Sequence, residues 1–260
     1  MQNKVIFISV DGMTPEGFLG CGHPWVQEMQ KRSAHSLNAS AMFPSVTLPC
    51  HLSMFYSVPP LRHGTLTNEY MPPVRPVPGL MEQISHAGGR CAMFFAWNPM
   101  RNIAHPDSLF QAEFLHGYAV DDMDAEMTRR ALDSIRRYDP DFIFLYMGDV
   151  DGKGGHDNGW MTPAYLERVN KAIGCVQQVM ETVGDTHTVI VTSDHGGHDR
   201  HHGSDLPVDM TIPMFFIGPR FAPGTILENI SLLDLAPTMA DVMGVAIPRE
   251  WEGKSLAQKA

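Results

Sequence analysis

The chain has 260 residues, of which 43% are hydrophobic, and its 19 basic and 29 acidic residues give a formal net charge of −10. This apolar content excludes a disordered chain, and the length suits one large α/β domain or two small ones. The acidic balance disfavours nucleic-acid polymers and anionic membranes as partners. Small anionic substrates remain compatible with this net charge if cations line their binding site.

The N-terminal MQNKVIFISVDG lacks the pattern of a signal peptide, and no apolar stretch approaches the roughly 18 residues of a membrane span. The cysteines are far apart and form no CxxC pair, which predicts free thiols at Cys21, Cys50, Cys91 and Cys175. We therefore expect a cytoplasmic protein with no membrane partner. Its oligomeric state stays open.

Short apolar runs alternate with amphipathic segments along the chain. In chain order the patterns predict a strand at 5–10, helices at 24–33 and 47–57, a proline-rich loop at 71–79, a helix at 79–88, a strand at 90–97, a helix at 121–138, a strand at 141–147, a helix at 163–184, strands at 186–194 and 212–218, and a helix at 231–244. This alternation predicts an α/β fold with a central, mostly parallel sheet and helices on both faces. Because no linker or repeat interrupts it, a single domain over residues 1–260 is expected.

Three of the predicted strands end in acids. VIFISVDG ends in Asp11, FIFLYMGDVDG contains Asp149 and Asp151, and VIVTSDHGG contains Asp194 and His195. Ligands of an open α/β sheet bind beyond the carboxyl ends of its strands. One such acid is commonly a turn or cap residue, but three strand ends, two with histidines nearby, favour a metal site. Carboxylate and imidazole ligands suit Zn²⁺, with Mn²⁺ or Fe²⁺ as alternatives, and the lack of adjacent cysteines favours an open catalytic site.

A candidate nucleophile lies in AMFPSVTLPCH (41–51). Ser45 and Thr47 follow a proline-containing turn at the expected start of a helix, where free backbone amides and the helix dipole favour an anion. Considered alone, the segment is more typical of an N-cap hydroxyl.

FPSVTLPCH, with VDG before it and SDHGG after it, resembles the alkaline phosphatase superfamily, and most closely its type I phosphodiesterase/nucleotide pyrophosphatase branch. The motifs follow one another over nearly the whole chain. The resemblance implies an alkaline phosphatase-like three-layer sandwich, two divalent metal ions and a covalent phosphothreonine intermediate.

The resemblance also implies roles for individual residues. Thr47, rather than Ser45, would be the nucleophile, and Asn68 in RHGTLTNEY would hold a phosphoryl oxygen. One metal ion would be held by Asp11, Thr47, Asp194 and His195. The other would be held by Asp151, His156 and His202.

One spacing departs from the family pattern. The family separates the acid and the histidine of the second metal by four residues, whereas Asp151 and His156 are five apart. Glycines in the intervening GKGG could absorb the extra residue, because glycine tolerates unusual dihedral angles. Asp149 is the alternative ligand, and Asp151 is favoured.

The leading hypothesis is a two-metal hydrolase that cleaves a phosphodiester or phosphonate ester of a small molecule. Residues 41–70 contain a single cationic side chain, Arg62, which favours a diester over a monoester dianion. The alternatives are a phosphomonoesterase or phosphotransferase on the same fold, and a metal-binding protein that has lost catalysis. The presence of Thr47 with a full ligand set argues against lost catalysis. A sulfatase is excluded because Cys50 precedes HLSM, which does not fit a CxPxR-type sequence.

Several other polar and aromatic residues lie near these motifs. We expect supporting or solvated positions for His198, Asp199, His201 and Asp205, with His198 the strongest candidate for supporting a ligand. Aromatic side chains that could stack on a flat leaving group, although ordinary packing is the commoner role, are Tyr70, Trp97 and Trp160.

Overall fold

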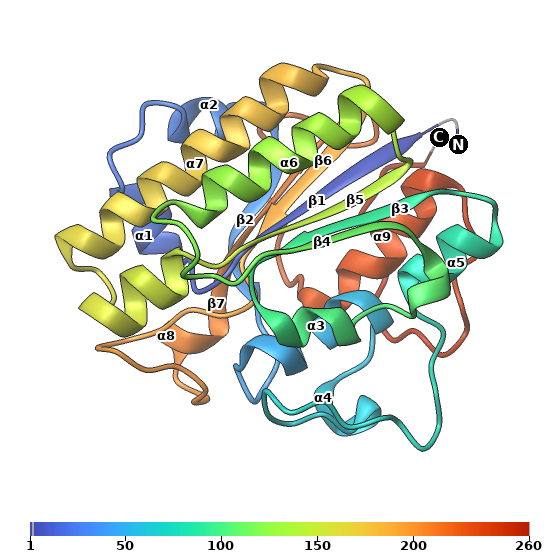
Figure 1. Cartoon of the computed structure of the whole chain (residues 1–260), viewed down its shortest axis with the longest axis horizontal. Coiled ribbons are helices and arrows are strands. Elements are labelled where there is room, and N and C mark those ends of the chain that lie inside the picture. Colours follow the sequence, from blue (N-terminus) through green and yellow to red (C-terminus); the bar gives the residue numbers. More distant parts are fainter. Residues whose placement is uncertain (2, 260) are drawn as a thin grey trace.

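The computed structural model describes residue 1 and residues 3–259, and it contains a seven-stranded sheet in the order β2-β7-β6-β1-β5-β3-β4 (Figure 1). The strands are β1 (Lys4–Val10), β2 (Ala34–Ser40), β3 (Cys91–Phe95), β4 (Leu109–Phe114), β5 (Phe142–Met147), β6 (His187–Thr192) and β7 (Thr211–Ile217). Strand β7 runs antiparallel to β2 and β6, and the other neighbouring pairs are parallel. The predicted α/β class with a mostly parallel central sheet is confirmed.

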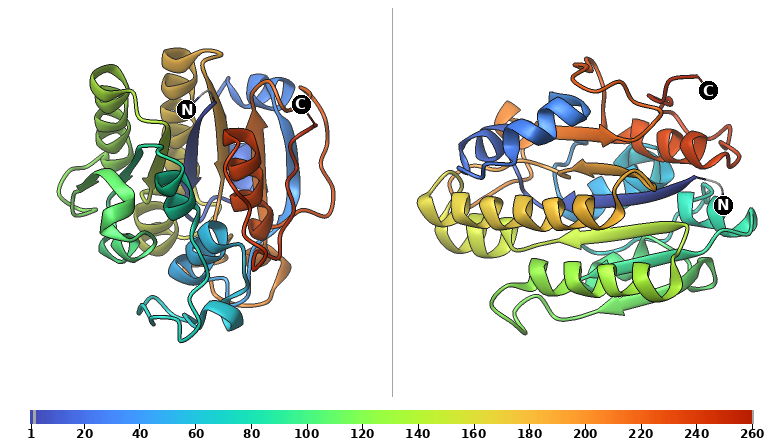
Figure 2. Two further views of the ribbon diagram at one scale, coloured as in Figure 1. Left: turned by 90° about the vertical axis from the view of Figure 1, so that its right-hand side faces the viewer. Right: turned by 90° about the horizontal axis from the view of Figure 1, so that it is seen from above.

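Helices cover both faces of the sheet (Figures 1 and 2). One face carries α1 (Pro15–Gly20), α2 (Val26–Arg32), α6 (Met123–Tyr138) and α7 (Pro163–Val183). The other carries α3 (Thr47–Tyr56), α5 (Leu80–His86) and α9 (Leu235–Met243). The shorter segments are α4 (Pro60–His63), η1 (Asn98–Asn102), η2 (Pro106–Ser108), the π-helix η3 (Val150–His156), α8 (Pro207–Met210) and η4 (Leu232–Asp234).

The core consists of two apolar clusters, one on each side of the sheet. Val5 and Phe7 of β1 belong to the cluster under α3, α5 and α9, whereas Ile6 and Ile8 belong to the cluster under α6 and α7. Successive side chains of a strand point to opposite faces, so an unbroken apolar strand is buried on both sides. Each such side chain contributes about 1.5–3 kcal/mol when fully buried. The central strands therefore hold the loops at their ends in fixed positions.

Two strands were missed by the sequence patterns. Both β2 (AHSLNAS) and β4 (LFQAEF) lie at the edges of the sheet, where a strand has one neighbour and carries polar, partly exposed residues. Their sequences therefore lack the apolar runs that marked the central strands. The helix expected at 231–244 is a one-turn η4 followed by α9.

The four cysteines are buried free thiols, as predicted. Among the helices of residue 1 and residues 3–259, none has both the length and the apolar character needed to cross a membrane.

Candidate active site

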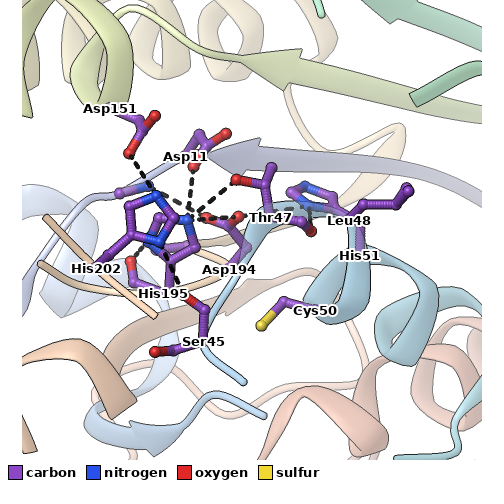
Figure 3. Close-up of polar contacts among 12 residues, drawn as sticks. Asp11, Ser45, Thr47, Leu48, Cys50, His51, Asp151, Asp194, His195 and His202 are labelled. Carbon is purple, nitrogen blue, oxygen red and sulfur yellow. Dashed lines mark hydrogen bonds and ion pairs between the residues drawn. The ribbon is translucent and has the colours of Figure 1, made fainter. Parts of the chain in front are cut away.

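The sheet topology brings the three acidic strand ends together. Strands β1, β5 and β6 are adjacent and parallel, so the residues after their carboxyl ends meet at one edge of the sheet (Figure 3). Gly12 turns the chain there with a φ of +70°, and a Cβ at this position would lie 3.0 Å from Asp151 Cβ. Only glycine allows this approach without displacing Asp151.

Asp11, Asp194 and His195 form what we call the inner group, and all three side chains are buried. His195 Nε2 lies 3.3 Å from Asp11 Oδ1 and 3.3 Å from Asp194 Oδ2. The opposite carboxylate oxygens are fixed, because the Tyr146 hydroxyl donates to Asp11 Oδ2 and the Gly12 amide donates to Asp194 Oδ1 at 3.2 Å. Asp11 Oδ1 and Asp194 Oδ2 are buried without a hydrogen-bond partner. Each carboxylate thus offers one oxygen to a cation.

Asp151, His156 and His202 form the outer group. Asp151 Oδ1 is 3.8 Å from His202 Nε2, and Asp151 Oδ2 is 3.5 Å from His156 Nε2. The His156 side chain is 43% exposed. The rings of His195 and His202 stack with centroids 3.8 Å apart, and the ligand atoms of Asp151, His195 and His202 lie within 4.8 Å of one another. His195 therefore lies at the boundary between the two groups.

The three imidazoles share one hydrogen-bonding arrangement. Each uses Nδ1 to contact a backbone carbonyl oxygen: His156 contacts Arg200 at 3.0 Å, His195 contacts Gly196 at 2.7 Å, and His202 contacts Ser45 at 2.9 Å. A carbonyl oxygen can only accept, so Nδ1 carries the proton and Nε2 presents a lone pair. Metal-binding histidines are oriented in this way by a partner on the other ring nitrogen.

The electrostatics of the site favour a bound cation. Burial raises the pKa of Asp11 well above its usual value, and the charges of Asp194 and Asp151 act in the same direction. Burial also raises the pKa of Asp194 to about 8 and lowers the pKa of His202 to about 3. Of the four buried side-chain polar atoms without a hydrogen-bond partner in residue 1 and residues 3–259, three are oxygens of Asp11, Asp151 and Asp194. Divalent cations would offset this repulsion and use the unpaired oxygens, so the residues fit metal binding.

The hydroxyls of Thr47 and Ser45 have different surroundings. Thr47 is the first residue of α3, and its Oγ1 lies 3.2 Å from His195 Nε2 and borders a cavity of about 260 Å³. Ser45 is fully buried, and its hydroxyl donates to the Ser204 carbonyl oxygen at 2.7 Å. Of these two hydroxyls, that of Thr47 borders the cavity and that of Ser45 does not.

Asn68 lines the same cavity. Its Oδ1 accepts a hydrogen bond from the amide of Leu48 at 3.1 Å, at the N-terminus of α3. The amide nitrogen of the Asn68 side chain keeps its donors for a ligand. The expected contact of Asn68 with a phosphoryl oxygen stays a prediction.

Asp149 and Asp151 also differ in their partners. Asp149 Oδ2 accepts from the Met123 amide at 3.0 Å, and its Oδ1 is 2.9 Å from Lys153 Nζ. Asp151 Oδ1 has no such partner. Asp149 is therefore engaged in protein contacts, whereas Asp151 faces the histidines.

The π-helix η3 accounts for the unusual spacing between Asp151 and His156. Within it the amide of Gly154 donates to the carbonyl oxygen of Asp149, five residues earlier, at 2.9 Å. A π-turn holds one residue more than an α-turn and commonly occurs at functional sites. The wide turn therefore accommodates the additional residue and still brings His156 next to Asp151.

His51 supports the site and was not identified from the sequence. It is fully buried, its Nδ1 donates to the Thr47 carbonyl oxygen at 2.8 Å, and its Nε2 accepts from the Ser9 hydroxyl at 2.9 Å. Burial lowers the pKa of His51 to about 3, which keeps the ring neutral. Its position one helical turn after Thr47 was the available signal.

Asp209 was also missed. This buried carboxylate accepts from the Ser204 amide at 3.0 Å and from the Ser204 hydroxyl at 2.6 Å, and it lies 2.8 Å from His198 Nδ1. It thus anchors the loop that carries His195 and His202, with His198 as a supporting residue. Nothing in the local pattern distinguishes Asp209 from a solvated loop acid.

The three candidate aromatic residues have different environments. Trp160 is buried, and its ring would collide with a side chain at Gly155 or Gly197, so it packs between loops of the site. Trp97 lines the cavity, whereas Tyr70 borders a separate small cavity.

The mostly parallel sheet, with carboxylate and imidazole groups at its strand ends and a hydroxyl at a helix N-terminus, defines a member of the alkaline phosphatase superfamily. More narrowly, the family model "Type I phosphodiesterase / nucleotide pyrophosphatase" matches residues 5–207. The chain belongs to this family.

Curated relatives match part of the chain. It is 31% identical over 139 residues to 2,3-bisphosphoglycerate-independent phosphoglycerate mutase from Antithamnion sp., across 50% of this chain and 26% of that protein. It is 33% identical over 103 residues to arylsulfatase K from Xenopus laevis, across 35% of this chain and 19% of that protein. The matches thus span about a quarter of these relatives or less.

Solved structures show the same fold over almost the whole chain. Murine ectonucleotide pyrophosphatase/phosphodiesterase 5 matches with a TM-score of 0.80 and 14% identity, covering 95% of this chain and 96% of that one. Phosphonate monoester hydrolase from Silicibacter pomeroyi matches with a TM-score of 0.70 and 16% identity, covering 98% of this chain and 76% of that one.

Proposed function

We propose that the protein is a metal-dependent hydrolase that cleaves a phosphodiester or phosphonate ester of a small molecule through a covalent phosphothreonine intermediate. The observation that carries the proposal is the Thr47 hydroxyl, which borders the cavity 3.2 Å from His195 Nε2 and beside carboxylates with unpaired oxygens. Family membership supports it. The structurally similar murine phosphodiesterase was solved as an inactive threonine-to-alanine variant in complex with AMP, which is consistent with a threonine nucleophile.

Two divalent metal ions would be held by these side chains, with Zn²⁺ preferred over Mn²⁺ or Fe²⁺ because the ligands combine imidazole and carboxylate. The inner group together with Thr47 would hold one ion, and the outer group would hold the other. When bound, such ions supply positive charge that favours the ionised hydroxyl and stabilises the developing charge on phosphoryl oxygens.

The protein's own residues account for the remaining chemistry. Thr47 Oγ1 attacks phosphorus, the new phosphorus–oxygen bond forms, the bond to the leaving oxygen breaks, and the hydroxyl proton passes to solvent. A water molecule then attacks the phosphothreonine and restores the hydroxyl. The N-terminus of α3 favours the anionic phosphoryl group, and Asn68 donates to one of its oxygens. His51 fixes the backbone of Thr47 through the carbonyl oxygen.

The charge of the cavity favours a diester or a phosphonate monoester, which carries less negative charge than a phosphate monoester. Among the described residues that line the cavity, Lys153 is the one lysine or arginine. Its ammonium group contacts Asp149 and two carbonyl oxygens, which leaves no donor for a substrate dianion.

A comparison of bis(p-nitrophenyl) phosphate with p-nitrophenyl phosphate, at defined metal content, tests the proposal. We expect a higher kcat/KM for the diester and loss of turnover after chelation. Equal or faster turnover of the monoester would overturn the diester preference.

A phosphotransferase is the second candidate, because several curated relatives of the chain are phosphoglycerate mutases. In that case the phosphoryl group of Thr47 passes to an acceptor hydroxyl in place of water. Product analysis in the presence of glycerol separates the two: a glycerol phosphate ester as main product supports transfer.

A further inference from the structure

Lys153 lies in η3 between the outer-group ligands Asp151 and His156, and its ammonium group is fully engaged. Nζ donates to the carbonyl oxygens of Val120 and Asp121, each at 3.0 Å, and lies 2.9 Å from Asp149 Oδ1. An ammonium group has three donors, so these three acceptors use all of them. The side chain is 12% exposed, which shields these contacts from solvent.

The two carbonyl groups belong to residues 115–122, which connect β4 to α6 and which we call the rim segment. No residue of the rim segment is buried, so little apolar packing holds it. Polar contacts are its main attachment, and besides Lys153 they include Arg168, whose guanidinium donates to the Asp121 carbonyl oxygen at 3.1 Å.

Tyr118 in the rim segment lines the active-site cavity. Its ring centroid is 5.6 Å from Lys153 Nζ, and its hydroxyl is 3.5 Å from Asp157 Oδ2. Tyr118 and Lys153 also border a second cavity, which is lined in addition by Arg168 and Lys171. These two side chains therefore belong to the walls of both cavities.

Asp149 connects the lysine to the sheet. Its Oδ1 pairs with Lys153, and its Oδ2 accepts from the Met123 amide in the first turn of α6. The pair thus joins the end of β5, the start of α6, the rim segment and η3. The same turn of η3 carries two outer-group residues and the lysine that holds the cavity wall.

We propose that Lys153 is a positioning residue that determines specificity: it holds Tyr118 and the rim segment as a wall of the cavity and so sets the fit of the ester group that does not react. This inference rests on the proposed function, because it concerns the substrate of the same site. A substrate with a small second ester group makes little use of the wall. A substrate with a bulky second ester group depends on it.

The kinetic test uses Lys153→Met, which keeps the length of the side chain and removes its charge, and Lys153→Arg, which keeps the charge. Lys171→Met is the matched surface control, since the ion pair of Lys171 within the described part of the chain is with Glu167 on the same helix. For bis(p-nitrophenyl) phosphate we expect Lys153→Met to raise KM about five- to tenfold with kcat nearly unchanged. For methyl p-nitrophenyl phosphate the rise in KM should be much smaller. Lys153→Arg should keep the KM for bis(p-nitrophenyl) phosphate close to that of the parent protein.

A second measurement does not depend on catalysis. Amide hydrogen exchange in the peptide covering residues 115–123 should become faster in Lys153→Met than in the parent protein or Lys171→Met, with metal content unchanged. Unchanged exchange, or an equal rise in KM for both diesters, would overturn the proposal. Loss of metal in Lys153→Met would also overturn it, because the lysine would then act on the ligands. If the parent protein hydrolyses neither ester, the proposed function fails, and the exchange measurement still decides whether Lys153 holds the rim segment.

Discussion

The inner and outer groups use the same kinds of side chain but are built differently. In the inner group the three side chains are buried; Asp11 directly follows the central strand β1, and Asp194 follows Ser193 just beyond the end of β6. In the outer group, Asp151 and His156 belong to the π-helix η3, and His156 is 43% exposed. The inner group is therefore formed by the core itself, whereas the outer group depends on a wide turn and on a loop.

This difference concerns preorganisation. A ligand held by a buried strand end keeps its position when the cation leaves, because moving it would disturb the packing around it. A partly exposed histidine in a turn loses fewer packing contacts when it moves. We therefore expect the inner group to bind its ion more tightly, and the outer group to tolerate exchange of its ion.

The largest expected effect concerns Thr47, the proposed nucleophile beside the inner group. Thr47→Ala should lower kcat by about 10³-fold or more, because the neighbouring hydroxyl of Ser45 bonds Ser204 and does not line the cavity. Thr47→Ser should keep part of the activity, and Ser45→Ala should cost less than about tenfold, since Ser45 only bonds a carbonyl group. Steady-state kinetics on the diester check this order. Full activity in Thr47→Ala would exclude the covalent mechanism.

The comparison of the two groups is tested directly with one candidate ligand from each. Asp194→Asn should lower kcat/KM by about 10²–10³-fold and lose one equivalent of metal during dialysis. His156→Ala should bind its ion more weakly but recover part of its activity when metal is added in excess. Metal content by mass spectrometry and activity after re-addition are the measurements. Greater loss of metal from His156→Ala than from Asp194→Asn would reverse the comparison.

Asp151 and Asp149 provide a matched pair near the outer group. Asp151→Asn should lose the outer ion with little loss of folding stability, because Oδ1 of this partly buried carboxylate makes no hydrogen bond that the substitution would break. Asp149→Asn should keep both ions but lower the free energy of unfolding by about 1–3 kcal/mol, since it leaves Lys153 without its carboxylate. Denaturant unfolding with metal analysis separates these outcomes. A stable Asp149→Asn protein that lacks one ion would identify Asp149 as the ligand.

The smallest effect concerns His63, which supports the turn that carries Asn68. Burial lowers the pKa of His63 to about 4 from 6.5, and the ring accepts from the Thr65 amide at 3.2 Å. Because the unfolded chain takes up the proton first, this contribution to stability is present above about pH 6.5 and is lost as the pH falls toward 4.

The contribution of His63 to the free energy of unfolding should be about 1–2 kcal/mol, which is less than the full pKa shift implies. The measurement is the free energy of unfolding in urea at pH 7.5 and pH 4.5 for the parent protein and His63→Gln. The variant should lose less stability between these two pH values, and an identical loss in both proteins would remove His63 as a cause.

The sequence predicted the helices and strands whose local hydrophobic pattern is strong. The apolar central strands and long helices such as α6 and α7 were found, because periodicity over many residues is a robust signal. The edge strands β2 and β4 were missed, since each satisfies its hydrogen bonds with partners distant in sequence and needs no apolar run. The same holds for His51 and Asp209, whose supporting contacts arise only when α3 and the histidine-rich loop pack against the sheet.

The sequence by itself determined which residue types follow the strands and in what order, and therefore the family and the candidate ligands. Tertiary structure alone decided which of two neighbouring groups is free. Ser45 and Thr47 are both hydroxyls, and Asp149 and Asp151 are both acids, but Ser45 bonds Ser204 and Asp149 pairs with Lys153. The physical reason is that a polar group can bind a ligand only if the fold does not already provide its partner, and those partners come from distant segments of the chain.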